Sequence, residues 1–463
     1  MSRLPSSWIH GPLYRLMIAA GLSLVLALAG GASRHDEVQQ AVVRSAALLA
    51  IGASLWPLDF TAPRRHAGIV AAIAAAYLLL VLQLVPLPPA IWAALPGHGA
   101  YAHIAEVSGT IGWRPLSLSP DLTLNALAAL LPATAMALAV LHLDFRDRAR
   151  LAGAVVVMAA ASGLLGLGQV ATGGLRLYHE TSQDSAVGLF ANRNHQAALM
   201  ACALPLTAAL AGLSLRKGAD RRLVLTLTSA TMLFLLIALL ATGSRMGLLL
   251  GLIGLVGAAW TWRAAGQRLW PVRRAARLGV GGALVVILGG LAAIIARGGA
   301  VGRLAPADIA GETRVALLEP LLTTAKAFMP LGAGFGTFDG VYRQFEPYAL
   351  LSTIYMNQAH NEPLQLAIEG GIPALTLLAT FLFWWGRAVW MATRPEVEAQ
   401  PGRGGRRRGM AVAAATATVI LMASSLVDYP LRTPLLGALF ALACVELAAA
   451  AARARRLAKA ARP

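Results

Sequence analysis

The chain has 463 residues, of which 57% are hydrophobic and only 13% are charged, and its formal net charge is +18. This composition excludes an ordinary soluble domain and favours a protein that crosses a membrane several times, because many apolar runs reach the ~20 residues that a helix needs to span a bilayer. The large positive charge raises the possibility of nucleic-acid binding, but the distribution of that charge along the chain argues against it.

Twelve apolar runs are long enough to predict membrane-spanning helices. No segment shows the alternation of polar and apolar residues that a membrane β-barrel requires, so the predicted fold class is all-α, a polytopic integral membrane protein. The first run has a basic flank but no small-residue cleavage site followed by a soluble domain, and we expect it to be a retained span rather than a removed signal peptide. The predicted spans are 13–31, 40–58, 67–85, 122–142, 150–170, 195–213, 223–241, 246–262, 278–296, 361–385, 410–427 and 435–452.

Basic residues divide unequally between the two sides of this arrangement. If the N-terminus is cytosolic, 27 of the 39 lysines and arginines fall in cytosolic segments, including the glycine- and arginine-rich tract 401–409, which we expect to be a flexible loop. Positive charge gathers on the cytosolic side of membrane proteins, so both termini are predicted to be cytosolic. Topology and contact with anionic lipids explain the charge without nucleic acid.

The same topology divides the chain into three predicted segments. Spans one to nine form a membrane domain at 1–296, a long non-cytosolic loop follows at 297–360, and spans ten to twelve complete the membrane domain at 361–463. The loop is far longer than ordinary connections, and its amphipathic stretch 315–328 predicts a short helix on the membrane surface.

Three glycines in this loop, Gly332, Gly334 and Gly336, resemble part of a nucleotide-binding loop. Such a loop needs a preceding strand and a βαβ unit, and neither is compatible with a connection between membrane helices. A tight turn packed against another loop is the better interpretation.

Arginines on the outer side are informative because topology does not require them there. Arg193, Arg245, Arg314 and Arg432 lie near the ends of different predicted helices. Guanidinium groups suit phosphate oxygens, and helix N-termini add partial positive charge. The alternative for each is an interfacial arginine that extends to the headgroups or a structural ion pair. That alternative is weaker for Arg193 and Arg245, which lie in tight polar motifs at helix starts.

Two histidines lie on the same predicted face. His360 and Asn361 open the tenth span, and His195 opens the sixth. A histidine can orient a hydroxyl nucleophile or take its proton, although a lone interfacial histidine is more often a satisfied polar group. Glu369 is nine residues beyond His360 and faces away from it on an ideal helix. We expect Glu369 to pair with an arginine or to support the break at Gly370 and Gly371.

Taken together, these motifs resemble the bacterial O-antigen ligase and polymerase superfamily. The resemblance rests on an F-x-N-x-N-H motif, a short S-R motif between two spans, a glycine-containing segment of the long loop, and H-N-x-x-L followed by E-x-G. These are Phe190, Asn192, Asn194 and His195; Ser244 and Arg245; Gly334, Gly336 and Phe338; and His360, Asn361, Leu364, Glu369 and Gly371. The motifs cover about 188–371, and the topology extends the resemblance over the whole chain.

The resemblance implies a C-type glycosyltransferase of the bacterial inner membrane that needs no metal and no other cofactor. It would move a glycan from undecaprenyl diphosphate onto an acceptor hydroxyl at the periplasmic face. The match assigns diphosphate binding to Arg193 and Arg245, with Arg245 stabilising the leaving group, and a catalytic role to His360. Asn194, His195, Asn361 and Glu369 support the site. The chemistry of Arg314 and Arg432 makes them further candidate ligands of the diphosphate.

Several acceptors remain open at this point. A polymerase adds the chain to another lipid-linked repeat unit, and the segments 334–342 and 428–434 favour this function for an exopolysaccharide or O-antigen. A ligase transfers the glycan to lipid A-core, and a related subgroup glycosylates proteins. A lipid-linked glycan transporter is the alternative of a different class, but it would place its charges near mid-bilayer, whereas the motifs here gather at one face.

Overall fold

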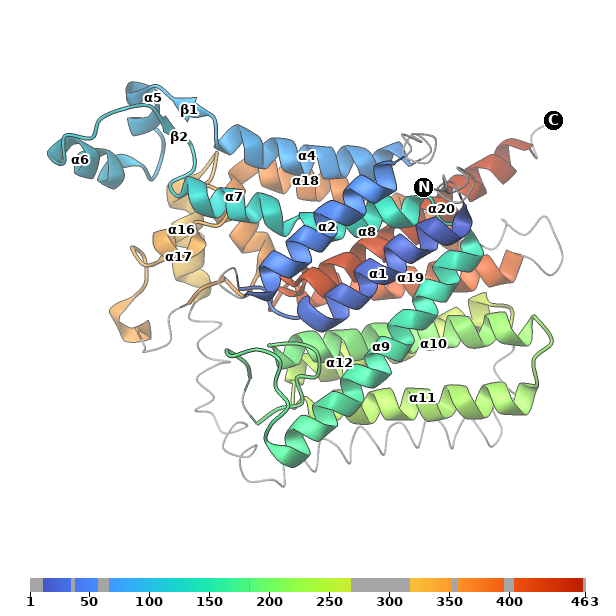
Figure 1. Ribbon diagram of the computed structural model, residues 1–463. Coiled ribbons are helices and arrows are strands. Elements are labelled where there is room, and N and C mark those ends of the chain that lie inside the picture. Colours follow the sequence, from blue (N-terminus) through green and yellow to red (C-terminus); the bar gives the residue numbers. More distant parts are fainter. Residues whose placement is uncertain are drawn as a thin grey trace, which may run out of the picture.

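The computed structural model describes residues 11–34, 38–56, 66–182, 184–267, 317–351, 356–394 and 404–460. Long helices form a bundle, and short elements cap one end of it (Figure 1). α1 begins and α20 ends at the opposite end of the bundle. The long helices are α1 (Pro12–Ala29), α2 (Gln39–Leu55), α4 (Ala67–Gln83), α7 (Pro120–Ala129), α8 (Leu131–Leu141), α9 (Phe145–Thr172), α10 (Arg193–Leu215), α11 (Arg221–Ala241), α12 (Arg245–Ala264), α18 (Glu362–Thr393), α19 (Gly404–Ser424) and α20 (Pro434–Ala460).

The predicted all-α membrane class is confirmed. Within the described residues, seven helical segments are long and apolar enough to cross a membrane, and α1 and α4 are shorter apolar helices. Helices coincide with eleven of the predicted spans, while the span predicted at 278–296 lies outside the described residues. The total of twelve spans and the three-segment division stay predictions.

The predicted span 122–142 coincides with one candidate span, Pro120–Leu141, which is interrupted between α7 and α8 because Pro132 lies in the first turn of α8 and cannot continue the hydrogen bonding of α7. One sequence prediction differs from the structure. The prediction that the tract 401–409 forms a loop is wrong for residues 404–409, which belong to α19. Tertiary packing overrides the weak helix propensity of glycine there: Gly409 lies against Ala265, and Arg408 Nε donates to the Thr393 carbonyl over 2.8 Å.

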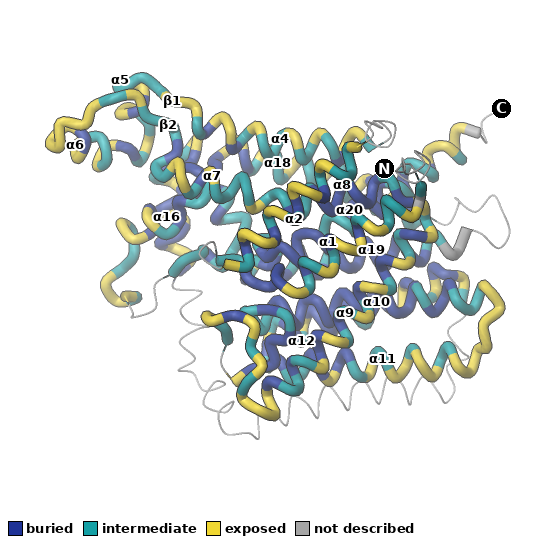
Figure 2. The backbone as a smooth tube through the Cα atoms, in the orientation of Figure 1, coloured by how far each residue is buried: buried dark blue, intermediate teal, exposed yellow. Residues whose placement is uncertain are grey.

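The centre of the bundle is α10, which packs against α9, α11, α12 and α19. Most of its residues are buried, whereas α11 exposes much of its surface (Figure 2). Small residues permit this close packing. A side-chain carbon on Gly247 of α12 would lie 2.6 Å from Cβ of Ala197, and one on Gly254 would lie 2.7 Å from the Ala201 carbonyl. The spacing of α10 and α12 is therefore fixed at the end where both helices begin.

The short elements cap the same end. β1 (Pro86–Leu87) pairs antiparallel with β2 (Arg114–Pro115), and α5 (Pro89–Ala93) and α6 (Gly99–Val107) lie between them. α16 (Leu318–Phe328), α17 (Phe338–Tyr342) and the 3-10 turn η1 (Tyr348–Leu350) occupy the described part of the long loop. The hydrophobic face of α16, which includes Leu321 and Phe328, packs onto α18 instead of standing apart from the bundle.

The glycine segment of this loop packs tightly against the start of α18. Gly332 has φ +82°, and a Cβ there would lie 2.5 Å from the Glu369 carbonyl. Gln83 bridges the two parts, since its Nε2 donates to the Glu369 carbonyl over 2.9 Å and its Oε1 accepts from Phe335 N over 2.9 Å. The segment thus makes the close turn that its glycines predict, and it fixes α18 relative to α4.

Candidate active site

Asp428 is the centre of a polar network at the capped end of the bundle. It follows α19, and its side chain is only 1% exposed. Its Oδ2 accepts from Asn194 Nδ2 over 2.7 Å and from Asn192 Nδ2 over 3.2 Å, and its Oδ1 accepts from Tyr429 N over 2.9 Å. Burial alone would raise the pKa of this carboxyl. The nearby imidazoles of His360 and His195 and the hydrogen bond from Asn194 outweigh that effect and hold the pKa well below its usual range.

Both predicted histidines face this carboxylate. His360 Nδ1 lies 3.5 Å from Asp428 Oδ1, and His195 Nε2 lies 3.9 Å from the same oxygen. Tyr429 separates the two rings, with centroids 4.9 Å from His360 and 5.4 Å from His195, and burial raises the pKa of its hydroxyl. The His195 side chain is 2% exposed and its Nδ1 lies 2.9 Å from Thr433 Oγ1, whereas the His360 side chain is 34% exposed. Only His360 is accessible to a substrate.

The backbone at His360 explains how its ring reaches Asp428. His360 adopts φ +49°, a left-handed conformation that costs free energy in a residue other than glycine. Asn361 then caps α18, accepting from Leu364 N at its Oδ1 over 3.0 Å and donating from Nδ2 to the Leu426 carbonyl over 3.1 Å. Asn361 therefore caps α18 and ties His360 to the segment that carries Asp428.

Arg193 and Arg245 begin α10 and α12, and their starts are joined. Ser244 Oγ donates to Asn194 Oδ1 over 2.7 Å and caps Gly247 N over 2.8 Å, so one hydroxyl connects the two helix ends. Arg245 is exposed and Arg193 is half-buried. The structure brings both arginines to the end of the bundle that holds His360, but neither lines the large cavity described next.

A cavity of about 640 Å³ lies beside the network. Its walls are mainly apolar and come from α4, α7 and α18, with Leu79, Ala126 and Leu377 among the lining residues. Its polar lining includes Arg34, Gln358, Glu362 and Arg432. His360 stands next to the cavity in the chain, between the lining residues Gln358 and Glu362.

Glu369 pairs with an arginine, which was one of its two predicted roles. Its carboxylate accepts from Arg432 NH2 over 3.2 Å and from Gln365 Nε2 over 3.1 Å, and it is 1% exposed. The helix breaks directly after it, where Gly371 has φ +57°. Arg432 is thereby held in the cavity lining, whereas Arg314 lies outside the described residues.

Asp428 and Arg34 are candidate site residues that sequence reasoning missed. Asp428 is the only acidic residue in 404–445 and ends an apolar run, which was a usable signal. Arg34 lies in the short segment between the first two predicted spans. Nothing local shows that it lines the same cavity as Arg432, 398 positions further along the chain.

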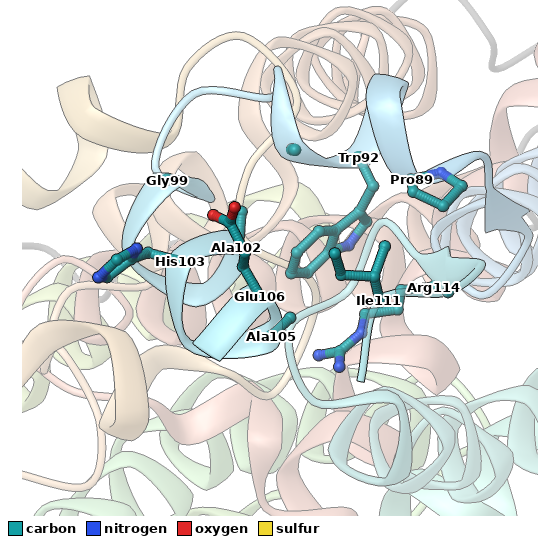
Figure 3. A pocket seen from close by; sticks show the side chains of 11 residues that line it. Pro89, Trp92, Gly99, Ala102, His103, Ala105, Glu106, Ile111 and Arg114 are labelled. Atoms are coloured by element: carbon teal, nitrogen blue, oxygen red, sulfur yellow. The ribbon is translucent and has the colours of Figure 1, made fainter. Parts of the chain in front are cut away.

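A second hollow, of about 300 Å³, lies in the α5–α6 cap and was not predicted (Figure 3). Trp92 and Ile111 form part of its lining, with Glu106 and Arg114 also around it. Trp92 Nε1 donates to the Pro115 carbonyl over 2.8 Å, and Arg114 lies 5.4 Å from the Trp92 ring centroid and donates to Thr110. These polar groups are satisfied within the cap itself.

Comparison with known proteins bears on the whole arrangement. Residues 230–379 match the family model described as O-antigen ligase. The predicted resemblance to the O-antigen ligase superfamily is confirmed. The matched range contains Arg245, the glycine segment, His360 and Glu369. A search of curated proteins found no match. The match over residues 230–379 points to glycan transfer in polysaccharide or lipopolysaccharide synthesis, with a lipid-linked glycan and an acceptor as substrates.

Proposed function

We propose that this protein transfers a glycan from undecaprenyl diphosphate to an acceptor hydroxyl at the periplasmic face of the inner membrane, and that it polymerises an exopolysaccharide or O-antigen. The observation that carries the proposal is the pairing of the accessible His360 with the buried Asp428 beside a cavity with apolar walls and arginines at its polar lining. Both termini would then be cytosolic, and the capped end of the bundle periplasmic.

The cavity suits a lipid-linked donor. Its apolar walls between α4, α7 and α18 match isoprenyl chains, and Arg432 and Arg34 supply positive charge for the diphosphate. Arg245 and Arg193 lie at neighbouring helix starts on the same end of the bundle. They add two further positive charges that can stabilise the negative charge developing on the leaving group. Fixed arginines can stabilise this charge without a metal ion.

Asp428 prepares His360 to accept a proton. The carboxylate faces Nδ1, so it favours the tautomer with hydrogen on Nδ1 and leaves the lone pair of Nε2 available, as the carboxylate does in a serine-protease triad. The acceptor oxygen attacks the anomeric carbon, the bond from that carbon to the phosphate oxygen breaks, and the acceptor proton moves to Nε2. Undecaprenyl diphosphate leaves as the anion. Attack opposite the leaving group inverts the anomeric configuration.

The family description favours one alternative, an O-antigen ligase whose acceptor is lipid A-core. The same His360–Asp428 pair and the same cavity would serve that reaction, with a different acceptor. Purified protein supplied with the host's lipid-linked donor distinguishes the two: a polymerase lengthens the lipid-linked glycan, and a ligase labels only added lipid A-core.

The decisive test uses His360→Ala in the same assay. Transfer should fall by about 10²–10⁴-fold, the usual contribution of a general acid or base, while the variant still binds donor. Transfer at the wild-type rate, or a product that retains the donor configuration, would remove this role from His360.

A further inference from the structure

Among the described residues, two buried polar atoms beside the large cavity have no hydrogen-bond partner. They are Nε of Arg432 and Oε1 of Glu362, and both residues line the cavity. Buried polar atoms in folded proteins are nearly always hydrogen-bonded, since leaving one unpaired costs free energy. An unpaired donor and an unpaired acceptor in one cavity therefore indicate a ligand that supplies the complementary groups.

Both residues are held in place by other contacts. Arg432 uses NH2 on Glu369, which is itself fixed by Gln365. Glu362 is the first residue of α18, and its backbone N donates to the Ser425 carbonyl over 2.9 Å. The backbone of Glu362 and the guanidinium of Arg432 are thus anchored independently of each other.

The two unpaired atoms require different chemistry. A guanidinium only donates hydrogen bonds, so Arg432 Nε suits a phosphate oxygen. A carboxyl oxygen that carries no hydrogen only accepts them, so Glu362 Oε1 suits a hydroxyl or an amide N–H. A glycosyl diphosphate carries both groups next to each other, at the bond between its first sugar and its phosphate.

We infer that Glu362 is a donor-sugar ligand: its Oε1 accepts a hydrogen bond from a hydroxyl or N-acetyl N–H of the first sugar, while Arg432 holds the adjoining phosphate. This rests on the proposed function and adds a means of recognition to it. Glu362 would then distinguish donor that still carries its glycan from the undecaprenyl diphosphate left after transfer. Arg432 would bind both.

The test compares two ligands on the purified full-length protein: the glycosylated donor isolated from the host, and sugar-free undecaprenyl diphosphate. Glu362→Ala should weaken binding of the glycosylated donor by about 10–100-fold, the range for a hydrogen bond to a charged group. Sugar-free lipid should bind the same variant at least as tightly as wild type. Glu362→Gln keeps an acceptor oxygen and should lose less. Arg432→Gln should weaken both ligands.

Glu106→Gln is the matched control, because Glu106 is an exposed carboxylate of the cap outside the cavity. It should change neither affinity. Equal weakening of both ligands by Glu362→Ala would show a structural role and overturn the inference, as would tighter binding of both. A wild-type protein that binds neither ligand would instead overturn the proposed function, so the two failures are distinguishable.

Discussion

The two hollows on the capped end differ in how their polar groups are satisfied. The α5–α6 hollow is built from one short stretch of chain, and its tryptophan and arginine are hydrogen-bonded within that stretch. The large cavity is lined by residues from both ends of the chain, and it contains buried polar atoms without partners. Size alone does not mark a functional site here. Unpaired buried polar atoms that line one cavity are the more informative sign of a binding site, because buried polar groups in folded proteins are nearly always hydrogen-bonded.

Among substitutions at this end of the bundle, we expect the largest loss of activity in the network around Asp428, beside the large cavity. Asp428→Asn keeps the shape of the side chain but removes the charge that faces His360 and His195. We expect transfer to fall by about 10³-fold or more, as for the equivalent change in a protease triad. Single-turnover transfer by the purified variant measures this, with size-exclusion chromatography to establish folding. Activity within a few-fold of wild type would separate Asp428 from the chemistry.

Substitution of Arg245 tests whether arginines outside the cavity lining also stabilise the diphosphate. Arg245→Ala should cost on the order of 2–4 kcal/mol of transition-state stabilisation, comparable to loss of an oxyanion donor. Arg245→Lys should recover only part of this, because an ammonium lacks the guanidinium fork. Arg221→Ala serves as a control, since Arg221 begins α11 at the opposite end of the bundle. Equal loss in both alanine variants would contradict the assignment.

The apolar walls of the cavity should control access of the lipid. Ala126→Trp adds a large side chain to the α7 wall and should raise KM for the undecaprenyl donor about tenfold, equivalent to roughly 1.4 kcal/mol. A donor analogue with a short isoprenyl chain should be affected less. Steady-state kinetics with both donors provide the measurement, and an identical KM change for the two chain lengths would show that the lipid does not occupy this wall.

The α5–α6 hollow should give the smallest effect. Glu106→Ala removes an exposed carboxylate that is not part of the large cavity, and transfer should stay within about twofold of wild type, as for most surface substitutions. Donor titration and transfer rate together check this. A loss comparable to that of Asp428→Asn would mean that the cap takes part in the reaction and that the contrast between the hollows is wrong.

The sequence was sufficient for most of the long helices and for naming several candidate site residues. Apolar runs predicted the positions of most long helices because the bilayer fixes the length and composition of a span. Asn194, His195, Asn361 and Glu369 were recognised from short motifs. Asp428 and Arg34 were missed because their significance arises from contacts across hundreds of residues. The helical residues 404–409 were missed because Ala265, far away in the chain, supplies the packing that glycine-rich sequence lacks.

The buried position of α10 has a consequence for how the protein is made. Its neighbours on two sides, α12 and α19, follow it in the chain, and α19 is more than 180 residues later. During synthesis α10 therefore enters the membrane before the surfaces that will cover it exist. Its alanine-rich flanks must contact lipid first and exchange that lipid for protein afterwards, which makes assembly of the site a late event that waits for the last helices.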